Sequence, residues 1–349
     1  MNPTLSYRDA LKKLQCRNDL EAEEAASLLE AVFKGELSEI QVAGLLAALA
    51  VKGESVSEII GFAQVLRHHG LRLRHQYPDL VDTAGTGGDT LGTFNISTTA
   101  AFVIAGAGVP VAKHGNRAIS SRCGSADVLG HLGVKIDASL ETLESCLVRC
   151  GMTFLFAPIF HQAMRTVANV RKGLGVRTIF NILGPLANPA HAKRQVIGVF
   201  SLDLTEKLAE ALRKLGCDHA LVLAGEDGLD EISLSGRTRI TEVKRDVMRT
   251  FWFEPESLGL KRQPLAQILG GEPEVNSKML RAILDRQAPG AGQDIVLANA
   301  AAGIYVSGRV ASLEAGFNEA RKSLESGAAL KKLEQLVACS NDVQPVDGS

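Results

Sequence analysis

The sequence predicts an α/β fold with two lobes, a small all-helical lobe and a large α/β lobe around a central, mostly parallel sheet. The first 75 residues contain only helical patterns, whereas short apolar runs alternate with helical patterns from residue 80 onward. Such alternation is typical of a parallel or mixed sheet, and 349 residues can bury a core in each lobe. We therefore expect a helical lobe at 1–75, joined by helices from about 170–190, and an α/β domain at 76–349.

The amino-acid composition excludes several classes of protein function. Apolar residues make up 46% and charged residues 22% of the chain, as in an ordinary globular protein, and the net charge is -1 with a pI near 6.7. This balance gives no electrostatic reason to expect nucleic-acid or membrane partners. The six cysteines include no C-x-x-C pair, so neither a zinc site nor a disulfide framework is indicated. The N-terminus has no signal-type apolar core, which predicts a cytoplasmic protein.

Four helices account for the first lobe. They are predicted at 7–16, 21–33, 39–52 and in a fourth segment that ends at residue 69. Ser38 and Ser57 are residue types that cap helix N-termini, and Gly53 and Gly70 can end the same helices. The fourth helix carries apolar residues beyond one buried face, at Ile59, Ile60, Phe62 and Val65. An exposed apolar patch usually marks an interface, so we expect this lobe to carry a dimer contact.

The α/β lobe continues in alternating segments. Strands are expected at 80–84, 109–112, 134–136, 153–156, 195–200 and 219–224, with further β-structure over 237–256. Helices are expected at 100–107, 124–132, 140–150, 205–215, 277–286, 294–307 and 316–337. Residues 338–349 read as a disordered tail.

A glycine-rich turn after the first strand is the strongest functional signal. The run Gly85-Thr86-Gly87-Gly88-Asp89 lets backbone N–H groups approach an anion, and the capping types Asn95, Ser97 and Thr98 begin the next helix. Lys113 and Arg117 follow the neighbouring strand, where open α/β sheets bind ligands. The run is neither a dinucleotide fingerprint, whose third glycine would fall on Thr90, nor a Walker A loop. Together the two loops predict a phosphorylated ligand.

A basic segment precedes the second half of the chain. Within Val170-Arg171 and Arg177-Thr178 the two arginines stand among apolar residues, although a run of charge is more often a solvated helix face. A charge in apolar surroundings usually has a partner, which here is either a ligand or a carboxylate between the lobes.

Two acidic residues, Asp230 and Glu231, follow a strand end and a glycine turn. Such pairs are more often solvated than ligating. A phosphate site favours the metal interpretation, however, because Mg²⁺ binds through one or two carboxylates plus ligand phosphates. The sequence has no local Ser-His-Asp or Cys-His signature, and lone histidines such as His114 and His161 are more often structural.

These blocks resemble the anthranilate phosphoribosyltransferase family in order and over roughly residues 5–335. The matching blocks are Gly85–Asp89, Asn95–Thr98, Lys113–Arg117, the segment from Val170 to Pro189, and Asp230-Glu231. The resemblance implies a nucleoside-phosphorylase-type fold and transfer of phosphoribosyl from 5-phosphoribosyl 1-diphosphate to the amine of anthranilate in tryptophan biosynthesis. It also implies two Mg²⁺ per subunit, a homodimer built through the helical lobe, and no nucleic-acid or membrane partner.

The resemblance also implies roles for individual residues. It places the sugar diphosphate on Gly85, Gly88, Asp89, Thr93, Asn95, Ser97, Thr98, Lys113, His114, Gly115, Asn116, Arg117, Ala118, Ile119, Ser120, Ser121 and Ser125. It places anthranilate on Gly85, Asn116 and Arg171, and the metals on Ser97, Asp230 and Glu231. No general acid or base is assigned, because an aromatic amine is already a nucleophile. Catalysis is expected to be electrostatic, through Lys113 and the metals.

Two other classes remain as alternatives. A pyrimidine nucleoside phosphorylase would share the fold, but its longer Lys/Ser-rich phosphate signature is not found. A non-catalytic paralogue that binds nucleic acid would need a basic surface and would be expected to lose the arginine block or the acidic pair. The near-neutral charge and the intact blocks argue against it.

Overall fold

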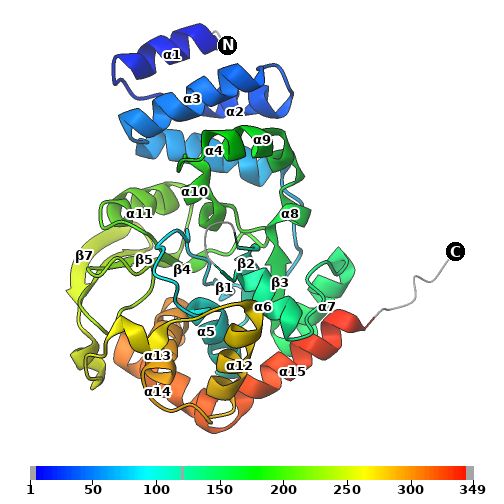
Figure 1. Ribbon diagram of the computed structural model, residues 1–349, viewed down its shortest axis with the longest axis vertical. Helices are drawn as coiled ribbons and strands as arrows, with labels where there is room; N and C mark the ends of the chain where they lie inside the picture. Colours follow the sequence, from blue (N-terminus) through cyan, green and yellow to red (C-terminus); the bar gives the residue numbers. More distant parts are fainter. Residues whose placement is uncertain (1–4, 119–121, 343–349) are drawn as a thin grey trace, which may run out of the picture.

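The computed structural model describes residues 5–118 and 122–342 and has the two predicted lobes (Figure 1). The helical lobe contains α1 (Tyr7–Gln15), α2 (Ala22–Phe33), α3 (Glu39–Lys52) and α4 (Val56–His69). The start of α4 corrects one prediction, because Ser55 caps the helix and Ser57 does not. Ser55 and Glu58 form a reciprocal capping box, whereas the Ser57 hydroxyl donates to the Leu20 carbonyl at 2.6 Å.

The apolar residues of α4 that were expected to form an exposed patch do not lie on the surface. Ile59, Phe62 and Val65 are fully buried, and Ile60 is half-buried. They belong to a core in which α4 packs against α2 on one side and against α11 (Leu204–Lys214) of the other lobe on the other. The interface predicted from these residues is therefore wrong in its location, since two neighbouring helices within the same chain cover them.

The large lobe is built on a seven-stranded sheet with the order β3-β2-β1-β4-β5-β6-β7. The strands are β1 (Val81–Asp82), β2 (Val111–Gly115), β3 (Met152–Phe156), β4 (Arg194–Gly198), β5 (His219–Gly225), β6 (Thr238–Lys244) and β7 (Val247–Phe253). Strands β1 to β5 are parallel, and the hairpin β6–β7 pairs antiparallel along one edge. The predicted mostly parallel sheet is confirmed.

Helices cover both faces of the sheet. The α-helices after α4 are α5 (Ile96–Gly106), α6 (Ser125–His131), α7 (Leu140–Cys150), α8 (Ala157–Phe160), α9 (Arg165–Leu174), α10 (Phe180–Leu183), α11, α12 (Pro273–Leu284), α13 (Ala291–Val306), α14 (Leu313–Glu325) and α15 (Ala328–Asn341). Of these, α9 and α10 pack against α2, α3 and α4 of the helical lobe and not on the sheet. Alternate residues of β5 serve two cores, because Leu221 and Leu223 face α5 and α13 whereas Ala220 and Val222 face α11 and the helical lobe. The core on the α11 side of the sheet is therefore shared by the two lobes.

Two expected elements of the large lobe differ from the structure. Residues 134–136 form no strand and lie in the connection between α6 and α7. The helix predicted over 316–337 is two helices, because Gly327 adopts φ 76°, a left-handed conformation that suits glycine and ends α14. The second of them, α15, extends into the expected tail as far as Asn341. Within the described ranges, no helix is both long and apolar enough to cross a membrane.

Candidate active site

The candidate site lies at the carboxyl ends of the parallel strands, where β1 separates β2 on one side from β4 on the other. This is the point at which the strand order reverses, the usual ligand site of an open α/β sheet. The glycine loop after β1 is held against the end of β4, since the Thr86 N–H donates to the Gly198 carbonyl at 2.8 Å. Gly87 and Gly88 have φ of 62° and 88°, so this loop path requires glycine.

The start of α5 and a buried lysine meet behind this loop. The Lys113 ammonium donates to the Thr83 carbonyl at 3.0 Å and to the Ser97 hydroxyl at 3.3 Å, and burial lowers the pKa of this lysine. The Ser97 N–H donates to the Glu231 carboxylate at 3.0 Å. Residues from three distant segments, after β1, at the start of α5 and after β5, are thus brought together as the sequence predicted.

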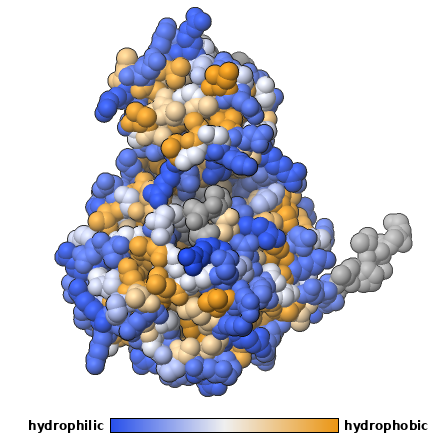
Figure 2. Space-filling view, viewed as in Figure 1, coloured by the Kyte–Doolittle hydropathy of each residue, from blue (hydrophilic) through white to orange (hydrophobic). Residues whose placement is uncertain are grey.

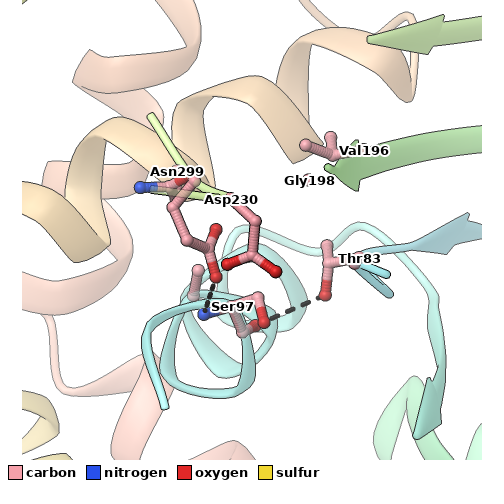
Figure 3. A pocket seen from close by; sticks show the side chains of 9 residues that line it. Thr83, Ser97, Val196, Gly198, Asp230 and Asn299 are labelled. Carbon is pink, nitrogen blue, oxygen red and sulfur yellow. Dashed lines mark hydrogen bonds between the residues drawn. The ribbon is translucent and has the colours of Figure 1, made fainter. Parts of the chain in front are cut away.

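The acidic pair lines a small cavity of about 10 Å³, with room for an ion or a water (Figure 3). The cavity is also lined by Thr83, Gly85, Ser97 and Asn299. Both carboxylates are partly accessible through the cavity, yet the protein around them excludes enough water to change their protonation. Desolvation, with the charges of Asp89 and Glu231, raises the pKa of Asp230 well above its usual range. Desolvation also raises the pKa of Glu231 to about 7, although Lys113 and Ser97 oppose the rise.

The described residues contain no cluster of three or more His, Cys, Asp or Glu side chains suited to a metal. A cation here would therefore need further oxygen ligands from a bound molecule, and phosphate groups supply such ligands.

Asn299 is a member of this site that sequence reasoning missed. Its side-chain oxygen accepts from the Ile232 N–H at 2.8 Å, and its nitrogen donates to the Ile232 carbonyl at 3.2 Å. It thereby holds the turn that carries Asp230 and Glu231. The available signal was a single asparagine within the apolar, small-residue part of α13 that follows Asp294. Such a residue has to satisfy a buried hydrogen bond.

A second, larger cavity of about 370 Å³ adjoins the glycine loop and lies between the lobes. Gly85, His114 and Asn116 line it from the α/β lobe, and Arg171 of α9 lines it from the opposite side. Much of the remaining lining is apolar: Leu66, Ala157, Pro158, Met164, Ala168, Phe180, Leu183, Pro185 and Ala187. The cavity therefore suits a small aromatic molecule with an anionic group.

Arg171 packs against an aromatic ring, and no carboxylate of the described residues lies beside it. Its guanidinium lies 5.4 Å from the centre of the Phe180 ring, and burial lowers its pKa. Among the described residues no acidic side chain pairs with it, which removes the alternative that it merely bridges the lobes. Arg177 differs, because it donates to the Gly88 carbonyl and lies 4.1 Å from the centre of the Phe200 ring.

The two histidines form a pair that the sequence did not indicate. The rings of His114 and His161 lie 5.2 Å apart at the wall of the larger cavity. His114 Nδ1 is 3.1 Å from the Gly184 carbonyl, which makes this nitrogen the donor. Desolvation, with the neighbouring His161, lowers the pKa of His114 to about 3, and burial also lowers the pKa of His161. Since the pKa of each ring is lowered, the positive charge in the lining of this cavity comes from Arg171 and the exposed Arg165.

The other predicted residues take varied places. Arg117 pairs with Asp127 at 3.0 Å, and Asp127 also accepts from the Ala118 N–H at 2.8 Å. The Ser125 hydroxyl donates to the Asn116 carbonyl at 3.3 Å. Gly115 ends β2, and Thr93 pairs with Leu269. Ile119, Ser120 and Ser121 lie outside the described residues.

Comparisons with known proteins agree with this geometry. The family described as "Glycosyl transferase family, a/b domain" matches residues 77–330, and "Glycosyl transferase family, helical bundle domain" matches residues 8–70. The chain is 48% identical over 330 residues to the anthranilate phosphoribosyltransferase of Pelotomaculum thermopropionicum, covering 95% of each chain. The chain belongs to the anthranilate phosphoribosyltransferases.

Solved structures of this family have the same fold. The Thermus thermophilus enzyme is 46% identical, with a TM-score of 0.89 over 95% of this chain and 99% of that one. The Saccharomyces cerevisiae enzyme, solved in complex with PRPP and Mg, is 29% identical, with a TM-score of 0.87 over 96% and 97% of the chains. The predicted family and fold class are confirmed.

Proposed function

We propose that this cleft transfers the phosphoribosyl group of 5-phosphoribosyl 1-diphosphate to the amine of anthranilate. The products are N-(5-phosphoribosyl)anthranilate and diphosphate, as in tryptophan biosynthesis. One observation carries the proposal: the glycine loop borders both a small cavity lined by two carboxylates and an apolar cavity lined by Arg171, which pairs with no acidic side chain of the described residues. A donor whose leaving group is diphosphate would fit the first cavity, and an aromatic acceptor with a carboxylate would fit the second.

The donor side suits Mg²⁺, which we propose binds at two ions per subunit. Ser97, Asp230 and Glu231 would supply hard oxygen ligands. Burial, with neighbouring negative charge, raises the pKa of both carboxyl groups, so a bound cation would favour their charged forms. When bound, the metal would offset negative charge on the diphosphate as the bond to the sugar breaks.

The chain's own residues supply the rest of the donor site. The Thr86 and Ser97 N–H groups are already taken by the Gly198 carbonyl and the Glu231 carboxylate. The phosphates would be held by the N–H groups of Gly87 and Gly88 in the glycine loop and by the Thr98 N–H in the first turn of α5. Lys113 adds a buried positive charge, which stabilises the departing diphosphate more strongly than an exposed lysine would. No protein base is required, because the aromatic amine attacks with its own lone pair.

The acceptor side orients that amine. The Arg171 guanidinium pairs with the carboxylate of anthranilate, and Asn116 adds a directional hydrogen bond from the loop after β2. The apolar wall holds the ring and excludes water, so the amine is fixed in line with the sugar.

A direct assay tests the proposal. The loss of anthranilate fluorescence would be followed with 5-phosphoribosyl 1-diphosphate, with and without Mg²⁺. We expect consumption that depends on the sugar diphosphate and on Mg²⁺. Purified, folded protein that consumes no anthranilate would refute the proposed function.

The chain would act as a cytoplasmic homodimer through its helical lobe, with the division near residue 75. Figure 2 shows hydrophobic residues on the surface of this lobe, where Ile40 and Val51 of α3 are 85% and 80% exposed. They are about three turns apart and so share one helix face. Sedimentation velocity should show a dimer that Ile40→Glu with Val51→Glu disrupts, whereas Val148→Glu on the α/β lobe should not. A wild-type monomer at micromolar concentration would contradict the interface.

A further inference from the structure

A buried asparagine far along the chain touches the start of α5. Asn276 of α12 is 2% exposed, and no block that indicated the function includes it. Its side-chain nitrogen donates to the side-chain oxygen of Asn95 at 2.9 Å, and its oxygen accepts from the Gly271 N–H at 2.7 Å. Asn95 in turn donates through its side-chain nitrogen to the Cys123 carbonyl at 3.1 Å. The two amides thus connect three segments around the donor side of the cleft.

The direction of this chain of hydrogen bonds is fixed at both ends. The Gly271 N–H can only donate, so the atom of Asn276 that faces it is the oxygen. The Cys123 carbonyl can only accept, so the atom of Asn95 that faces it is the nitrogen. Only one orientation of the two side chains satisfies every group.

In this orientation the Asn95 side chain does not cap the N-terminus of α5. Asn95 stands at the N-cap position, where its oxygen would ordinarily accept from an N–H of the first turn. That oxygen accepts from Asn276 instead, so Asn95 makes no cap bond to α5, and the Glu231 carboxylate accepts from the Ser97 N–H. No described residue accepts from the Thr98 N–H, which remains available to an anion at the helix start.

The backbone holds α12 in the position that this contact needs. The Gly270 N–H donates to the Gly92 carbonyl at 2.8 Å, and the Phe94 N–H donates to the Ile268 carbonyl at 3.1 Å. A Cβ at Gly270 would lie 2.7 Å from the Phe94 Cα, so only glycine permits this approach. The segment before α12 is thereby paired with the segment before α5.

We infer that Asn276 is a positioning residue for the sugar diphosphate. It keeps the amide oxygen of Asn95 bonded to α12 and away from α5, so that the Thr98 N–H in the first turn of α5 stays available to the phosphates. The inference rests on the proposed function, because it deepens the donor half of the same site. Asn276 itself contacts no substrate and acts through Asn95.

The test uses isothermal titration of the full chain with 5-phosphoribosyl 1-diphosphate and Mg²⁺, and separately with anthranilate. Asn276→Asp keeps the shape but replaces the donor by an acceptor, which opposes the Asn95 oxygen. We expect its Kd for the sugar diphosphate to rise about tenfold, since a buried hydrogen bond is lost. The Kd for anthranilate should stay within about twofold of wild type. Asn276→Ala should also raise the Kd for the sugar diphosphate.

Two controls separate positioning from stability. Ser277→Ala removes a neighbouring buried hydroxyl that bonds to the Glu274 carbonyl at 2.9 Å, and it should leave both affinities unchanged. In an Asn95→Ala background, Asn276→Ala should add little to the loss, because the two residues act in series.

The outcomes are distinct. A selective loss for the sugar diphosphate that is non-additive with Asn95→Ala supports the inference. Wild-type affinity in Asn276→Ala, or equal losses for both substrates with a lowered Tm, overturns it. If Asn276→Asp does not fold, Asn276→Ala decides alone. Wild-type protein that fails to bind the sugar diphosphate would instead sink the proposed function.

Discussion

The two halves of the cleft hold buried groups of opposite charge. In the half next to β5, Asp230 and Glu231 stand together in a small polar cavity, and the pKa of each carboxyl is raised. In the half next to α9, the Arg171 guanidinium stands in a large apolar cavity with neutral histidines, and its pKa is lowered. The glycine loop separates them, and Gly85 lines both.

The difference suggests how one loop can serve two unlike substrates. A buried group whose charged form is disfavoured gains most from a ligand of opposite charge, because the ligand replaces the water that folding removed. The acidic half is therefore completed by a cation, and the apolar half by an anion. Each half should bind the other half's ligand only weakly, which keeps the donor and acceptor sites distinct.

The largest effect should come from removing the acidic charge. Asp230→Asn with Glu231→Gln keeps the shape of both side chains but removes the proposed metal ligands, so kcat should fall roughly a hundredfold or more. Anthranilate binding should be nearly unchanged. Without Mg²⁺ the variant should melt no lower than wild type, because burial disfavours the charges that are removed.

Steady-state kinetics at saturating substrates and thermal melts give both readouts for this variant. Glu334→Gln, on the exposed face of α15, is the control and should have wild-type kcat. Full activity in the double variant would show that the acidic half has no role in the reaction.

The next effect should come from the other half. Arg171→Ala removes a charge-assisted hydrogen bond worth about 1.5–3 kcal/mol, so the anthranilate KM should rise at least about tenfold. The KM for the sugar diphosphate should stay near wild type. The Tm should not fall, since no described carboxylate loses a partner. An unchanged anthranilate KM with a lowered Tm would assign Arg171 a structural role instead.

A pH titration sharpens the description of the apolar half. The pKa of His114 is about 3 in the folded protein, below the usual value of 6.5. Between these values the unfolded chain binds a proton that the folded chain does not, so acid destabilises the fold across this window. The slope attributable to His114 is at most about 1.4 kcal/mol per pH unit.

The variant His114→Gln should weaken this dependence, and urea unfolding from pH 7 to 4 measures it. The control is His131→Gln, which alters an exposed histidine of α6. Equal slopes for wild type and His114→Gln would contradict the buried, neutral state of the ring.

The smallest effect should lie at the border between the halves. Arg177 reaches from the turn after α9 to the Gly88 carbonyl and covers the Phe200 ring. Arg177→Ala should loosen the glycine loop and raise the KM for the sugar diphosphate about two- to fivefold, with little change for anthranilate. Arg177→Lys should recover only part of this, because lysine lacks the planar fork. An effect on anthranilate alone would place Arg177 in the acceptor half.

The sequence by itself determined the elements whose causes are local. Serine caps and ending glycines located the first-lobe helices, with Ser55 in place of Ser57 as the one shift. The glycine run follows β1 and the acidic pair follows β5, and this order was visible in the sequence. Lys113 was expected after its strand but lies within β2. Parallel strands bring their carboxyl ends to one edge of the sheet, so chain order predicted that these segments meet, while the roles of the individual residues stay predictions.

Only the tertiary structure decided which residues touch. Ile59 and Phe62 looked like an exposed surplus, because a helical pattern cannot tell a partner helix from solvent. The pairing of Asn276 with Asn95 and of His114 with His161 depends on packing between segments far apart in the chain. From the sequence, the partner of Arg171 could be either a ligand or a carboxylate. In the folded chain Arg171 lines a largely apolar cavity. Burial and contact are properties of the packed chain, and local composition constrains them only in part.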